Sequence, residues 1–83
     1  MDKAKLISEL TQMDERDRTK KGFNPYALGM YFQAADSVFE LIADGATPEH
    51  AFSDCFTPTR GMHRVARNLG LKLDVQKGNW TSI

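Results

Sequence analysis

The N-terminal part of the chain alternates apolar and polar positions with the period of a helix. Four apolar residues fall three or four positions apart: Leu6, Ile7, Leu10 and Met13. This spacing predicts an amphipathic helix over about residues 3–16. The stretch DERDRTKKG that follows contains no apolar residue, so we expect a fraying helix end and a charged linker that leads to Phe23.

The strongest hydrophobic pattern lies between Pro25 and Ala43. On a helical wheel, the apolar side chains of this stretch cover more than half of the circumference and leave only a narrow polar sector. A helix that is apolar over so wide an arc needs cover on at least two sides, so we expect it to be the central helix of the domain. Asp44-Gly45 ends it, since glycine suits a left-handed cap.

Each proline follows a residue that can cap a helix: Asn24-Pro25, Thr47-Pro48 and Thr57-Pro58. The side chain of Asn or Thr accepts a hydrogen bond from a free amide of the first turn, and proline at the first helical position loses no bond. These pairs predict three helix starts. Two of the helices are short, one over about residues 48–56 and one from the third proline to Gly70.

The pattern changes to a period of two after Gly70. Leu71, Leu73 and Val75 alternate with polar residues, which indicates a strand, and a turn at residues 77–79 leads to Trp80, which we expect to pack on the helices. The sequence therefore predicts an all-α single domain, residues 1–83, with about four helices, a central hydrophobic helix and a short C-terminal β-like tail. Residues 1–21 form its N-terminal helix and linker, residues 24–83 form its core, and residues 47–70 are helix-turn-helix-like.

Charge is balanced overall but segregated along the chain. With 11 basic and 11 acidic residues there is no global field to attract phosphate, and 83 residues suffice for one small core. No Lys or Arg occurs between Gly22 and Thr59, and from Arg60 onward five cations face a single acid, Asp74. The acidic middle of the chain consists of Asp36, Glu40, Asp44, Glu49 and Asp54.

The arginines of the last predicted helix give the first functional hypothesis. Two short helices with an arginine-lined second helix are the arrangement that a helix-turn-helix module uses to enter the major groove. The candidate nucleic-acid contacts are Arg60, His63, Arg64 and Arg67, with Lys72 and Lys77 as outer phosphate contacts. The RTKK cluster at residues 18–21 adds a second patch if the linker lies beside this helix. The alternative is an ordinary solvated helix face, because any amphipathic helix needs one.

A protein-binding role is the competing hypothesis. The chain would act as an inhibitor or adaptor, for example of phage or mobile-element type, on a larger host machine. It would use the acidic middle or an exposed aromatic side chain such as Tyr31 or Trp80. The wide apolar arc of the central helix also predicts a homodimer if no other element covers it.

Catalytic and metal-binding chemistry finds little support in the sequence. The lone Cys55 excludes an internal disulfide and favours a reducing cytoplasm, and neither a signal peptide nor a membrane-spanning run is visible. The spacing of His50, Cys55 and His63 matches no zinc pattern, so we expect no metal and no cofactor. Cys55 with His63 is the one nucleophile and base pair to consider, and we expect no enzyme.

Overall fold

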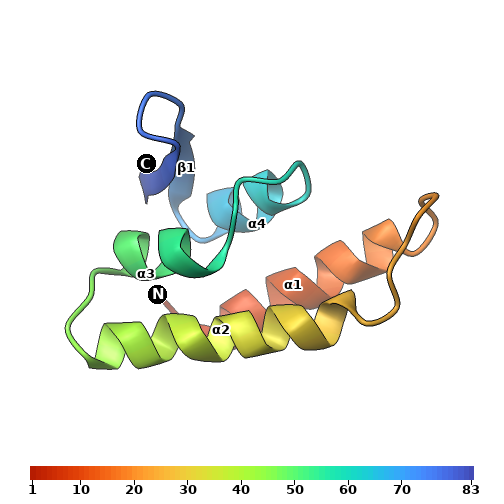
Figure 1. The fold of residues 1–83 in the computed structure, drawn as a ribbon, viewed down its shortest axis with the longest axis horizontal. Helices are drawn as coiled ribbons and strands as arrows, with labels where there is room; N and C mark the ends of the chain where they lie inside the picture. Colours follow the sequence, from red (N-terminus) through yellow and green to blue (C-terminus); the bar gives the residue numbers. More distant parts are fainter.

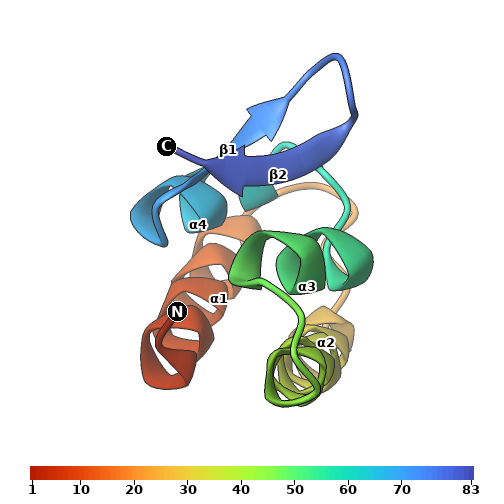
Figure 2. The ribbon, with the colours of Figure 1, turned by 90° about the vertical axis from the view of Figure 1, so that its left-hand side faces the viewer.

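The computed structural model describes residues 1–83 and is mostly helical, since four helices contain 57% of the residues and the rest includes one antiparallel pair of strands. The elements are α1 (Lys3–Asp17), α2 (Ala27–Ala43), α3 (Pro48–Cys55), α4 (Met62–Asn68), β1 (Leu71–Asp74) and β2 (Asn79–Ser82). The two long helices α1 and α2 run side by side, α3 and α4 lie across them, and the hairpin lies on top (Figures 1 and 2). The predicted helical class and the C-terminal hairpin are confirmed.

Local capping explains where α1 and α3 begin. The Asp2 side chain accepts from the amide of Ala4 at 3.0 Å, and Thr47 accepts from the amide of His50 at 3.2 Å, so α1 and α3 start as the sequence predicts. Asn24 instead accepts from the amide of Tyr26 at 2.9 Å in a turn. Helix α2 therefore begins at Ala27, two residues after the predicted start.

The predicted helix start at Thr57-Pro58 is wrong. The backbone of Phe56 is extended, with φ −126° and ψ 117°, and its carbonyl accepts a hydrogen bond from Nε1 of Trp80 at 2.9 Å. The carbonyl of Thr57, which would be the first acceptor of a helix capped there, accepts instead from the amide of Thr59 at 2.8 Å, and α4 starts only at Met62, whose amide donates to the carbonyl of Thr59. Helix α4 is consequently about one turn shorter than expected.

The buried core is shared by all four helices and the hairpin, and α2 does not lie at its centre. Of the thirteen buried apolar residues, α1 and α4 contribute three each and α3 contributes two, and α2 contributes Ala35 and Val38. Helix α2 packs against α1 and α3 and forms one side of the lowest layer, as Figure 2 shows. The expectation of a central helix is therefore wrong, because α4 and the hairpin pack on α1 and α3 and leave one flank of α2 uncovered. Met30 on that flank is 61% exposed.

Trp80 anchors the hairpin to α3. The strands pair in a register that places Leu73 opposite Trp80, and the Trp80 side chain is only 2% exposed. The Ser53 hydroxyl accepts from the amide of Trp80 at 2.9 Å and donates to its carbonyl at 3.3 Å. Trp80 is thus a core residue that packs on the helices as predicted, and it offers no exposed ring to a partner protein.

Candidate nucleic-acid interface

Helix α4 presents two arginines to solvent because its other face is buried. Met62, Val65 and Ala66 face the core, so Arg64 and Arg67 lie exposed on the opposite side. The amide of Asn68 donates from Nδ2 to Oε1 of Glu9 at 2.7 Å, which fixes the rotation of α4 against α1. The arginine pair is therefore exposed because the apolar residues of α4 face the core and the bond to Glu9 fixes how the helix is rotated.

The linker after α1 lies beside the loop that precedes α4. Lys20 and Lys21 from the linker and Arg60 from the loop line one hollow of about 700 Å³, which we call the linker hollow. An adjoining hollow of about 240 Å³ is shared by Arg16, Lys20, Arg60 and Arg64. The second basic patch that the sequence offered thus meets the first one in space.

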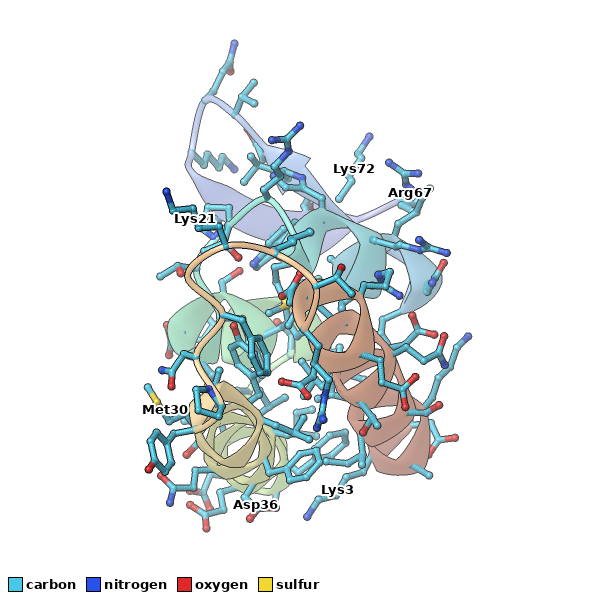
Figure 3. The ribbon with its side chains drawn as sticks, turned by 90° about the vertical axis from the view of Figure 1, so that its right-hand side faces the viewer. Lys3, Lys21, Met30, Asp36, Arg67 and Lys72 are labelled. Atoms are coloured by element: carbon cyan, nitrogen blue, oxygen red, sulfur yellow. The ribbon has the colours of Figure 1, made fainter.

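Lys72 extends the same surface onto the hairpin. It lies on β1 and shares a third hollow, of about 250 Å³, with Arg67. Figure 3 shows Lys21, Arg67 and Lys72 on the half of the molecule away from Lys3 and Asp36. We call this surface the basic face, and it consists of Arg16, Lys20, Lys21, Arg60, Arg64, Arg67 and Lys72.

Only one acid lines these three hollows. Asp17 lies in the first two, and its Oδ1 is 3.0 Å from Nζ of Lys20. No Asp or Glu side chain lines the third hollow. A surface with so many cations and one paired acid carries a positive local potential, although the whole chain is neutral.

Of the remaining predicted nucleic-acid contacts, His63 lines the third hollow beside Arg67 and Lys72, and Lys77 lies apart. The imidazole of His63 is half-buried and meets the Trp80 ring edge-on, with ring centroids 5.3 Å apart. His63 therefore packs the hairpin onto α4. Lys77 lies in the hairpin loop and shares a separate hollow with Glu49 and Asp74, so it is not part of the basic face.

The acidic middle is spread over α2 and α3, and several of its carboxylates already have partners. Asp36 on α2 forms an ion pair with Lys3 at 2.8 Å, and Asp54 on α3 lies 3.5 Å from His50. None of the five acids lines a hollow of the basic face; the full set is Asp36, Glu40, Asp44, Glu49 and Asp54. A phosphate bound in these hollows therefore has none of these five acids beside it.

Glu49 illustrates how the hairpin and α3 interact at this acidic side. The Ser82 hydroxyl donates to Oε1 of Glu49 at 2.6 Å. This hydrogen bond is the largest cause that holds the pKa of Glu49 below its ordinary value, because it stabilises the carboxylate. Glu49 is therefore ionised and engaged within the protein.

The aromatic side chains divide into core and surface groups. Tyr31 is half-buried and packs against the core, and it also lines the linker hollow. Tyr26 is 79% exposed at the start of α2. Phe23 lines the linker hollow and does not pack against the core, and it is not among the residues that the sequence singled out. The sequence did contain a signal for Phe23, because it is a lone aromatic residue between a lysine pair and a turn.

Other kinds of chemistry have few matching groups in the structure. Burial raises the pKa of the Cys55 thiol, and the charge of Asp54 raises it further, whereas a nucleophilic cysteine needs a lowered pKa. His63 is packed on Trp80. No cluster of three or more His, Cys, Asp or Glu side chains has the arrangement of a metal site.

Comparisons with protein-family models, with curated proteins and with solved structures found no match. None of the four helices combines the length and the apolar character that a membrane crossing requires.

Proposed function

We propose that this protein binds nucleic acid through the basic face, with α4 directed at a groove of the duplex and the hairpin beside it. The observation that carries the proposal is the convergence of cations from three segments distant in sequence. The linker supplies Lys20 and Lys21, the region of α4 supplies its arginines, and β1 supplies Lys72. An ordinary solvated face of α4 would not require additional cations from the linker and the hairpin.

The order of elements supports this use of α4. Helices α3 and α4 are joined by a short loop, and the second helix exposes Arg64 and Arg67, as the recognition helix of a helix-turn-helix module does. Gly70, with a φ of +82°, turns the chain directly from α4 into the hairpin. This places Lys72 next to Arg67. A hairpin in this position, like the wing of a winged helix-turn-helix protein, would touch the phosphates beside the groove.

The chemistry of arginine fits such a surface. Its guanidinium group donates two parallel hydrogen bonds to a phosphate or to the acceptor edge of guanine. No ion pair or side-chain hydrogen bond within the protein engages Arg60, Arg64 or Arg67. All three are free to bind phosphate without first breaking an internal contact.

The test compares a double variant, Arg64→Ala with Arg67→Ala, against the wild type. We expect about 10- to 100-fold weaker binding to a mixed-sequence duplex, measured by fluorescence anisotropy at about 50 mM salt. Since each phosphate contact contributes about 0.9 to the slope of log K against log salt, loss of two contacts should lower the magnitude of that slope by about 2.

The matched control removes two cations that lie outside the basic face. Lys3→Ala with Lys77→Ala changes the net charge of the protein by the same amount, and Lys3 pairs with Asp36 on the far side. We expect this control to keep the wild-type affinity within about threefold. Equal weakening by both double variants would mean that only net charge matters, and the basic face would lose its role.

Protein binding through α2 is the second candidate, and the exposure of Met30 and Tyr26 favours it. The partner that fits best is a second copy in antiparallel contact. The acids of α2 lie in its C-terminal half, and its first turn contains no acid. Antiparallel pairing puts each acidic half beside the positive N-terminal end of the other helix and keeps the acids apart.

A further inference from the structure

The linker hollow contains two cations that no group of the protein neutralises. Lys20 is paired with Asp17, but Lys21 and Arg60 take part in no ion pair and no side-chain hydrogen bond. Both line the hollow, one from the linker and one from the loop before α4. The hollow is therefore suited to an anion.

The same hollow contains an aromatic ring that the core does not use. Phe23 is half-buried, yet it is not packed against the buried cluster. The guanidinium carbon of Arg18 lies 5.9 Å from the centre of its ring. Tyr31, from the first half of α2, lines the hollow as well. A ring held in place at the surface beside unpaired cations points to a ligand with both a flat face and a negative charge.

A nucleotide combines these two properties. Proteins that bind single-stranded nucleic acid use a cationic groove for the phosphates and aromatic side chains on which the bases stack. The volume of about 700 Å³ lies within the range of small-ligand sites, and the lining is mainly polar, which disfavours an apolar ligand. In a continuous duplex the faces of the bases are covered by their neighbours, so only an unpaired base can reach the ring.

We propose that the linker hollow binds an unpaired nucleotide, with its base against Phe23 and its phosphate between Lys21 and Arg60. This inference rests on the proposed function and names the class of nucleic acid, namely a strand with an unpaired segment next to the basic face. Arg60 lines both the linker hollow and the adjoining one that contains Arg64. A strand bound along α4 therefore reaches the linker hollow without leaving the cationic surface.

The experiment measures the affinity for a labelled 15-nucleotide oligothymidylate and for a labelled mixed-sequence duplex of the same length. The variants are Phe23→Leu, Phe23→Trp and the control Tyr26→Leu, which removes an exposed aromatic ring outside the hollow. We expect Phe23→Leu to weaken single-strand binding about tenfold and to leave duplex binding within about twofold. Phe23→Trp should retain the wild-type affinity, and so should the control.

The fold should persist in these variants because neither Phe23 nor Tyr26 packs against the core, and circular dichroism verifies this. Equal single-strand affinity in the wild type and Phe23→Leu would overturn the inference but leave the proposed function intact. Equal loss for duplex and single strand would also overturn it, since the ring would then not select an unpaired base. If the arginine double variant binds duplex as well as the wild type while Phe23→Leu loses the single strand, the proposed function fails and the hollow stands.

A competition experiment separates a strand from a free nucleotide. Thymidine 5′-monophosphate should displace the oligothymidylate only at concentrations far above the dissociation constant of the strand, because one nucleotide lacks the contacts with Arg64 and its neighbours. Displacement by the monophosphate at the same concentration as by the unlabelled strand would overturn the assignment to nucleic acid. A wild type that binds neither oligonucleotide would overturn both the inference and the proposed function.

Discussion

Replacing Trp80 with Phe tests the contact on which the position of the hairpin depends. The substitution keeps an aromatic ring in the core but removes the indole N–H that donates to the carbonyl of Phe56. This bond is buried, so no water replaces the lost donor. The ring also lies edge-on to Phe52, with centroids 5.7 Å apart, and the smaller phenyl group leaves part of this space empty.

The expected cost follows from these two losses. An unpaired buried carbonyl costs about 1–3 kcal/mol, and the loss of two buried ring carbons costs about 1.5 kcal/mol. We therefore expect the free energy of unfolding to fall by about 2.5–4.5 kcal/mol. A domain of this length has a total stability of about 4–12 kcal/mol, so Tm should fall by roughly 10–35 °C.

Urea and thermal unfolding followed by circular dichroism at 222 nm measure this change, because the variant no longer contains a tryptophan for fluorescence. Val75→Ala is the control, since Val75 is 82% exposed in the hairpin loop and should change stability by less than about 0.5 kcal/mol. If Trp80→Phe costs no more than this control, the indole bond does not hold the hairpin and the loop before α4 in place.

Two further predictions concern the acidic side and α2. Ser82→Ala should raise the pKa of Glu49 toward its ordinary value, which carboxyl-carbon NMR titration detects; an unchanged pKa would contradict the assigned cause. Because the native pKa is lowered, the contribution of this bond to stability is present above the ordinary glutamate pKa and is lost as pH falls through the lowered value, so wild type and variant should converge in acid. If α2 pairs with a second copy, light scattering of the wild type at high concentration should give the mass of a dimer, and Tyr26→Ser with Met30→Ser should give that of a monomer. A monomeric wild type would remove the second candidate function.

The charged surface shows why a net charge of zero is a poor guide to binding. The acids of α2 and α3 help to bring the formal net charge to zero, but none of them lines a hollow of the basic face. At physiological salt, charges more than about 8 Å apart are largely screened from each other. A phosphate near Arg60 therefore responds mainly to the cations around it.

Helix α1, the capped start of α3 and the hairpin could be predicted from the sequence because each depends on residues a few positions apart. The hydrogen bond that the amide of His50 donates to the Thr47 side chain and the alternation after Gly70 are of this kind. The exposure of Arg64 and Arg67 was also predictable, since the apolar residues of α4 leave only one face for them. These features are local, and local pattern decides them.

Contacts between distant segments decided the rest. Thr57-Pro58 has the local signal of a helix start, but Trp80, 24 residues beyond Phe56, binds the Phe56 carbonyl, and the Thr57 carbonyl accepts from the amide of Thr59 in a tight turn instead of starting a helix. The apolar arc of α2 shows how much of its surface other elements could bury. Whether they do so depends on how α4 and the hairpin pack. The meeting of Lys20 and Lys21 with Arg60 likewise exists only in the folded chain, because the packing of α4 against α1 brings the linker and the loop together.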